Sequence, residues 1–174
     1  MKSIVVVGEN STAADRRYME FLKNCFESSR QRLVFAGNSF SDRESGEEEL
    51  VLCECGKIER INSKNCILLL KESFCPKNII GSLHGCTAIV SSENEYGVKF
   101  LAEQGIQTVT CGLSGKDTVT ISSFTGERVM VSLQRELRSC SGKMLQPVEI
   151  SVELGSIRDR YTIMSGIAAK LLAE

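Results

Sequence analysis

The junction between the first apolar segment and the first amphipathic segment is where this chain would bind a phosphate group. Ser3–Gly8 (SIVVVG) is typical of a buried parallel strand, and Thr12–Phe26 is typical of a helix. The turn between such a strand and helix holds phosphates through backbone amides at the helix N-terminus. A phosphate loop also needs glycines and a Gly-Lys-Ser/Thr sequence where the helix starts. Here Ala13, Ala14 and Asp15 occupy those positions, so the architecture for nucleotide binding is present but its chemistry is missing.

The turn still offers groups that could bind an anion. Its backbone amides lie at a helix N-terminus, and two of its side chains carry hydroxyl groups. The candidate residues for binding an anion or a nucleotide are Gly8, Asn10, Ser11 and Thr12. The carboxylates of Glu9 and Asp15 oppose this role electrostatically. The alternative, which we favour, is an ordinary turn in which Thr12 and Asp15 form a capping box.

Glu54 is the candidate metal ligand. It ends the apolar run Leu50–Glu54, at the carboxyl end of a predicted strand, where α/β proteins bind their ligands. One carboxylate alone binds Mg²⁺ weakly unless phosphates share the ion. A metal role for Glu54 therefore depends on a nucleotide in the same site, and a polar residue that ends a strand is the alternative.

Other reactive side chains are favoured as structural. The eight cysteines fall mostly in apolar runs, as expected of buried free thiols in a reducing compartment, and no Cys-x-x-Cys pair is present. Cys53 and Cys55 share one face of a predicted strand, which leaves a thiol-based metal or redox protein as an alternative. The single histidine, His84, has no nearby acid to orient it in a Cys-His dyad. Gly112–Thr118 contains Gly-Lys, but an alternating strand follows it, so we interpret it as a turn.

The elements that must position these residues are short strands and a few helices. Six apolar runs rich in β-branched residues predict strands buried on both faces of a parallel sheet. They are Ile4–Gly8, Leu33–Gly37, Leu50–Glu54, Cys66–Leu70, Thr87–Ser91 and Thr108–Cys111. Helices are predicted at Thr12–Phe26 and Glu93–Gln104, with a short helix within Cys75–Leu83, and the acidic stretch Asp42–Glu49 predicts a solvated loop.

The pattern changes after residue 112. Thr118–Ser123 and Arg128–Leu133 alternate apolar and polar residues around a Thr-Gly turn, which predicts a hairpin, and Val148–Leu154 alternates too. Ser156–Ala173 predicts a closing amphipathic helix, with Ser156 and Asp159 as its cap. The predicted fold class is α/β, a three-layer, mostly parallel sheet of Rossmann-like or P-loop-like order. Residues 1–112 form its parallel part, and residues 113–174 add an antiparallel extension and the closing helix within one domain.

Composition excludes several classes of function. The net charge of −1 gives no electrostatic basis for binding nucleic acid or an anionic membrane. No apolar run approaches the roughly 20 residues of a membrane span, and no signal-peptide pattern is present, so a cytoplasmic location is expected. The expected partner is another protein or a small ligand, and an oligomer is compatible with the composition.

The order of several motifs resembles the central, ATP-binding domain of the Mur ligases, which join amino acids to peptidoglycan precursors, and of the related folylpolyglutamate synthases. Leu50–Gly56 (LVLCECG) resembles the family strand that ends in a metal-binding glutamate, which would be Glu54. Thr87–Asn94 (TAIVSSEN) and Thr108–Ser114 (TVTCGLS) resemble two further strand ends. The hairpins beyond match the family's β-extension, and Tyr161–Leu171 resembles the helix that follows it.

The departures from the family matter as much as the likeness. The phosphate-loop lysine that would contact the β- and γ-phosphates is absent, as is the hydroxyl that would hold Mg²⁺. Leu70–Cys75 (LKESFC) has no histidine where the family has one, and the flanking domains for the UDP-sugar and the amino acid are expected to be missing. The resemblance therefore implies a non-catalytic binding or regulatory module near bacterial cell-wall metabolism, without a cofactor. The alternative is a nucleotide- and Mg²⁺-binding protein or enzyme with a site rebuilt around Gly8 and Glu54.

Overall fold

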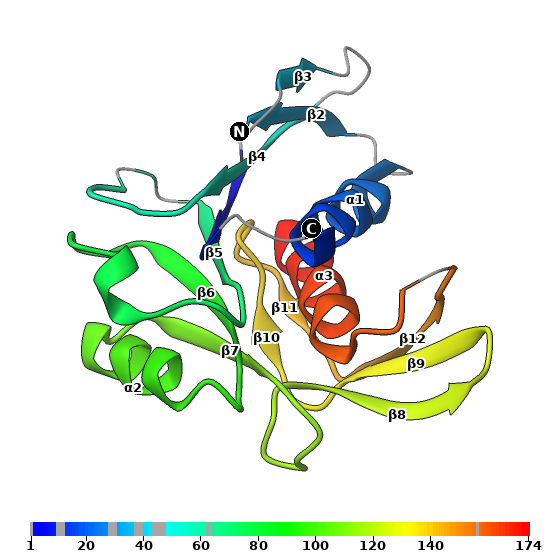
Figure 1. The fold of residues 1–174 in the computed structure, drawn as a ribbon. Helices are drawn as coiled ribbons and strands as arrows, with labels where there is room; N and C mark the ends of the chain where they lie inside the picture. Colours follow the sequence, from blue (N-terminus) through cyan, green and yellow to red (C-terminus); the bar gives the residue numbers. More distant parts are fainter. Residues whose placement is uncertain are drawn as a thin grey trace.

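The computed structural model describes residues 2–9, 13–27, 31–36, 40–42, 48–61, 63, 65–155 and 157–174. The described helices are α1 (Ala13–Glu27), α2 (Glu95–Gln104) and α3 (Arg160–Ala173), with one 3₁₀ turn, η1 (Pro76–Asn78). The strands of the main sheet are β1 (Lys2–Val7), β2 (Gln31–Ala36), β3 (Phe40–Asp42), β4 (Glu48–Cys55), β5 (Cys66–Leu70), β6 (Cys86–Ser91), β7 (Gln107–Cys111), β8 (Val119–Thr125), β9 (Arg128–Leu133) and β12 (Val148–Glu153). Two short strands, β10 (Leu137–Arg138) and β11 (Met144–Leu145), form a separate ribbon. Figure 1 shows their arrangement.

Among the described residues, the main sheet has ten strands in the order β12-β9-β8-β7-β6-β5-β1-β4-β2-β3. The seven central strands, from β8 through β7, β6, β5, β1 and β4 to β2, run parallel to one another. At the two ends of the sheet, β3 pairs antiparallel with β2, β9 pairs antiparallel with β8, and β12 pairs antiparallel with β9. The predicted fold class is therefore confirmed, including its antiparallel extension. The chain places β1 between β4 and β5, so residues that follow these three strands meet at one edge of the sheet.

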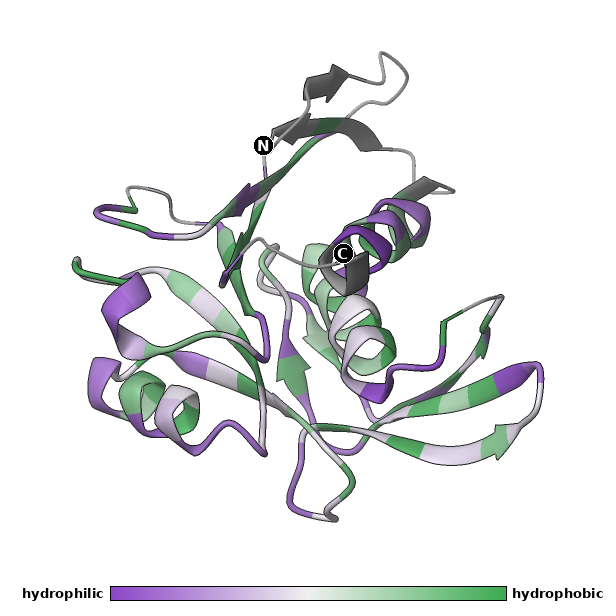
Figure 2. Ribbon diagram, viewed as in Figure 1, coloured by the Kyte–Doolittle hydropathy of each residue, from purple (hydrophilic) through white to green (hydrophobic). Residues whose placement is uncertain are grey.

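Both faces of the parallel part are covered, which gives the three predicted layers. In β5, Ile67 and Leu69 belong to the core under α1 and α3, whereas Leu68 and Leu70 belong to the core under α2 and η1. Such two-sided burial explains why this strand is a continuous apolar run rather than an alternating one. Figure 2 shows α1, α3 and α2 with their apolar residues toward the sheet.

Helix α3 is buried more completely than the sequence predicts. A stripe of apolar residues predicts one solvent-facing side, but from Tyr161 to Ala173 every residue except Lys170 is buried. The reason is that α1 packs on α3 while β8 and β9 curl around it, as Figure 1 shows. Asp159 caps the helix as predicted, because its carboxylate accepts a hydrogen bond of 2.6 Å from the Thr162 amide. Ser156, the other predicted cap residue, lies outside the described residues.

One local prediction was wrong at its boundaries. The predicted loop Asp42–Glu49 is bounded by strands, because β3 ends at Asp42 and β4 already begins at Glu48 through parallel pairing with β2. The short helix predicted within Cys75–Leu83 is confirmed as the three-residue 3₁₀ turn η1. Within the part of the chain that the structure describes, no helix is both long enough and apolar enough to cross a membrane.

Candidate functional site

The candidate site lies where β4, β1 and β5 end side by side. Gly8 directly follows β1, Glu54 is the next-to-last residue of β4, and Lys71 directly follows β5. Residues at the carboxyl ends of neighbouring parallel strands project toward the same edge, which is the edge where open α/β sheets bind ligands. The topology thus brings Gly8 and Glu54 together, as the rebuilt-site hypothesis requires.

Sequence reasoning missed the residue that dominates this site, Lys71. Its ammonium Nζ lies 2.7 Å from Oε1 of Glu54 and 3.4 Å from the carbonyl oxygen of Glu9. The two charged side chains are 4% and 9% exposed, so the ion pair is buried. The available signal was the position of Lys71 immediately after the fully buried strand CILLL. The side chain of a lysine at this position can lie buried at the edge of the sheet. A buried ammonium requires a partner, because lysine is rarely buried unless it is paired.

The lysine side chain crosses directly over Gly8. Gly8 has a φ of +153°, and a Cβ atom built on it would lie 2.7 Å from Cβ of Lys71 and 2.9 Å from Oγ of Ser73. Such contacts are shorter than real Cβ atoms tolerate, so only glycine fits below this lysine. Because the lysine reaches from β5 across β1 to β4, its aliphatic part covers the point where the predicted phosphate turn begins.

The backbone around Gly8 is also engaged within the sheet. The Gly8 amide donates to the carbonyl oxygen of Cys55 at 3.3 Å, and the Lys71 amide donates to the carbonyl oxygen of Val7 at 2.8 Å. The parallel ladder therefore continues past the ends of the strands. The other candidate residues of this turn, Asn10, Ser11 and Thr12, lie outside the described residues, so their anion-binding role stays a prediction.

The electrostatics of the site are set by burial and by the ion pair. Burial and, after it, the nearby groups of Cys53 and Glu54 together raise the pKa of the Cys55 thiol to about 11, and Lys71 opposes this shift. Among the described residues, no group of three or more His, Cys, Asp and Glu side chains is arranged to hold a metal ion. A Mg²⁺ ion at Glu54 would therefore depend on oxygen ligands from a bound phosphate, and it would compete with Lys71 for the carboxylate.

The remaining sequence candidates lie elsewhere. Gly112–Thr118 is a turn, as interpreted from the sequence: Asp117 accepts a hydrogen bond of 2.9 Å from the Ser114 amide. The guanidinium of Arg135 donates to the carbonyl oxygen of Lys116 at 2.7 Å and ties the turn to the rest of the fold. His84 is exposed. All eight cysteines are free thiols, three of them buried and five half-buried.

Comparison with solved structures gives the family likeness. The murein peptide ligase Mpl from Psychrobacter arcticus 273-4 superimposes with a TM-score of 0.58 over 99% of this chain, at 11% sequence identity. The chain has the fold of a Mur ligase domain. It spans 44% of the length of Mpl, as one domain of a larger ligase would. No family model and no curated protein matches the sequence. The resemblance read from the ordered motifs is thus confirmed at the level of fold.

Proposed function

We propose that this chain is a non-catalytic, Mur-ligase-like binding or regulatory module in which the ligase chemistry has been lost. The observation that carries the proposal is the buried ion pair between Lys71 and Glu54, which lies across the end of β1. In this position the protein's own cation and anion occupy the edge where a nucleotide would bring phosphate and Mg²⁺. The missing lysine and hydroxyl of the phosphate loop support the same conclusion.

The energetics of the ion pair oppose nucleotide binding. If Mg²⁺ displaces Lys71 from the Glu54 carboxylate, the ammonium loses its partner while its side chain is only 4% exposed. Removing one partner of a buried pair costs about 3–5 kcal/mol, because the other charge stays buried and uncompensated. At 1.4 kcal/mol for each factor of ten, this penalty weakens binding by about two to four powers of ten. We therefore propose that the module works without a cofactor, in the cytoplasm, and binds a protein or a small ligand.

One observation favours the second candidate, a nucleotide-binding protein with a rebuilt site. Lys71 brings an ammonium group next to Gly8, although it comes from β5 and not from the loop itself. A phosphate that replaced Glu54 as the partner of Lys71 would keep the ammonium compensated and release the carboxylate for Mg²⁺. For the metal-binding form of the thiol-based alternative, no metal-binding group of thiols is found among the described residues.

Isothermal titration calorimetry with ATP and Mg²⁺ distinguishes the two candidates. The wild-type chain is expected to show no saturable binding up to millimolar nucleotide, and a dissociation constant in the micromolar range would overturn the non-catalytic proposal. In that case Glu54→Gln should weaken the Mg²⁺-dependent affinity at least tenfold. The matched control is Lys57→Met, which removes the exposed partner of Glu59 and should leave the titration unchanged.

A further inference from the structure

The outer edge of β12 is open in the described structure. β12 is the last strand of the sheet and pairs on one side with β9, and no other described strand pairs with it. The Leu154 amide donates to the carbonyl oxygen of Glu127 at 3.0 Å, which fixes the alternation of the antiparallel ladder. The backbone N–H and C=O groups of Glu149, Ser151 and Glu153 therefore point away from β9. Along the six residues of β12, every second residue thus presents its N–H and C=O groups on the open side of the strand.

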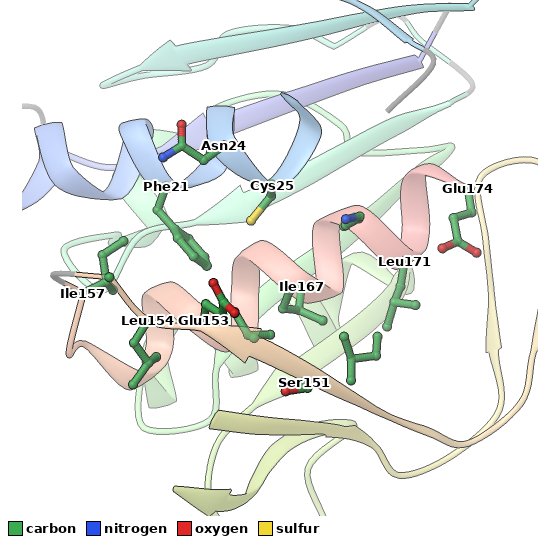
Figure 3. A pocket seen from close by; sticks show the side chains of 14 residues that line it. Phe21, Asn24, Cys25, Ser151, Glu153, Leu154, Ile157, Ile167, Leu171 and Glu174 are labelled. Carbon is green, nitrogen blue, oxygen red and sulfur yellow. The ribbon is translucent and has the colours of Figure 1, made fainter. Parts of the chain in front are cut away.

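A cavity runs along this open edge. Its volume is about 600 Å³, and it is bounded by the six consecutive residues Ile150–Gly155 and by side chains of α1 and α3. Figure 3 shows Phe21 and Cys25 of α1 and Ile167 and Leu171 of α3 around the same space as the strand. Because consecutive residues line the cavity, it follows the strand rather than touching it at one point. Its volume is that of a small-ligand site, or of a few residues of extended chain.

We propose that the edge of β12 binds an extended segment of a partner protein as an added strand, in which apolar and basic residues alternate. Main-chain hydrogen bonds to an open edge supply affinity in this mode of recognition, and alternate side chains supply specificity. Ile150 and Val152 pack toward the core, whereas Glu149, Ser151 and Glu153 are exposed. Residues opposite Ile150 and Val152 would enter the cavity and must be apolar.

The charges of β12 determine which residues the partner segment should carry between its apolar residues. Residues opposite Glu149 and Glu153 would lie on the exposed face beside these carboxylates, where an opposite charge directly across two strands stabilises the pair. Glu153 already forms an ion pair of 3.0 Å with Arg128 of β9, which partly neutralises it. Glu149 should therefore attract a basic residue of the partner more strongly than Glu153 does. Around the cavity the charges of Lys170 and Glu174 balance each other, and Glu153 adds a negative charge. The edge therefore selects lysine or arginine on its exposed face.

The same charges oppose the pairing of two copies of this chain. An antiparallel pair of β12 strands centred on Ser151 would place Glu149 of one copy opposite Glu153 of the other, twice. Like charges directly opposite each other destabilise a strand pair, and charged residues on edge strands prevent edge-to-edge association. A basic partner segment is thus favoured over a second copy. Binding at β12 needs nothing from the Gly8 turn, so it goes beyond the proposed loss of nucleotide binding.

The test is the fluorescence anisotropy of a labelled peptide of sequence Val-Lys-Val-Lys-Val-Lys-Val against the full chain. Ser151→Pro removes an outward N–H group, and proline is tolerated where the N–H of an edge strand faces solvent. Ser151→Ala keeps that N–H and is the matched control. We expect the wild type and Ser151→Ala to bind alike, and Ser151→Pro to bind at least tenfold more weakly while it still unfolds cooperatively.

A second variant keeps the proposal falsifiable if Ser151→Pro fails to fold. The double substitution Glu149→Lys and Glu153→Lys should reverse the preference, so that it binds the peptide Val-Glu-Val-Glu-Val-Glu-Val more tightly than the lysine peptide. Failure of the wild type to bind the lysine peptide would overturn the proposal, as would unchanged binding by a folded Ser151→Pro. Sedimentation that shows a wild-type dimer dissociated by Ser151→Pro would replace the basic partner with a second copy. Titration with ATP and Mg²⁺ decides the proposed function independently of all these outcomes.

Discussion

Replacing Lys71 with methionine tests whether the ion pair across β1 is as buried and as isolated from solvent as the structure shows. The substitution keeps most of the aliphatic chain that covers Gly8, but it removes the ammonium from Glu54 and from the carbonyl oxygen of Glu9. The Glu54 side chain, 9% exposed, would then be a buried carboxylate without its cation. We expect a loss of about 3–5 kcal/mol in the free energy of unfolding, the size measured when one partner of a buried pair is removed.

Urea and thermal denaturation would measure this loss. For a chain of this size, each kcal/mol lowers the Tm by about 2–4 °C, so Lys71→Met should unfold about 6–20 °C below the wild type. The double variant Lys71→Met and Glu54→Leu replaces both charges with apolar side chains and should recover most of the loss, because such replacements are often neutral or stabilising. Lys57→Met is the control, since its ion pair with Glu59 joins side chains that are 55% and 79% exposed. It should change stability by less than about 1 kcal/mol.

Two results would refute this account. If Lys71→Met were as harmless as Lys57→Met, the Glu54 carboxylate would have to be accessible to solvent, and the site would be open rather than closed. If the double variant were less stable than Lys71→Met alone, the second substitution would not compensate for the first. The inference that the two side chains depend on each other through the ion pair would then be wrong.

Further predictions concern the glycine below the lysine and the buried ionisable groups. Gly8→Ala should cost about 1–3 kcal/mol, the range for a strained backbone conformation, because its Cβ would meet Lys71; Gly115→Ala, which meets nothing within 4 Å, is the control in the same denaturation assay. Burial raises the pKa of Cys25 from 9.0 to about 12 and that of Tyr161 well above 10.0, so both groups are held neutral in the folded chain. The contribution of each neutral group to stability is complete below its pKa in the unfolded chain and is lost as the pH rises above that value. In urea unfolding from pH 8 to 11, the free energy of unfolding should therefore decline by up to about 1.4 kcal/mol per pH unit for each group. Tyr161→Phe should make the decline above pH 10 shallower. Burial and then neighbouring carboxylates raise the pKa of Glu72, so Glu72→Gln should raise the thermal stability at pH 7 by a few tenths of a kcal/mol and have no such effect at pH 3, where the carboxyl is protonated in both states.

The strands of the parallel sheet were predictable because burial on both faces leaves a strong local signal. Cys66–Leu70 was predicted with both boundaries as observed, since an uninterrupted apolar run of five residues fits a central parallel strand. Arg128–Leu133 was equally well predicted from its alternation, which only Met130 interrupts and which is the pattern of a strand with one exposed face. In both segments a property of neighbouring residues in the sequence decides the structure.

The Lys71–Glu54 pair was not predictable by the same means, because it depends on the order of strands in space. Glu54 lies near the end of β4 and Lys71 follows β5, and only the insertion of β1 between these strands places the two residues on either side of Gly8. The complete burial of α3 escaped prediction for a related reason. Its apolar stripe and its small residues were visible, but the coverage by α1, β8 and β9 arises from the curl of the sheet. Local patterns determine elements, and contacts between distant elements determine the site.

The position of Lys71 is compatible with the loss of the phosphate loop that we propose. A phosphate loop holds a cationic side chain and several amides around a bound anion; without the anion, such a cluster of donors is unfavourable in the interior. Here the cation comes from β5, its anion is Glu54 of β4, and the Gly8 amide donates to Cys55. Each of these groups is thus satisfied by the protein itself. A nucleotide that used both Lys71 and Glu54 would have to replace the ion pair between them, whereas a partner that adds a strand to β12 would not displace it. A protein segment bound at the edge of β12, as we propose, would therefore leave the ion pair at the strand ends intact.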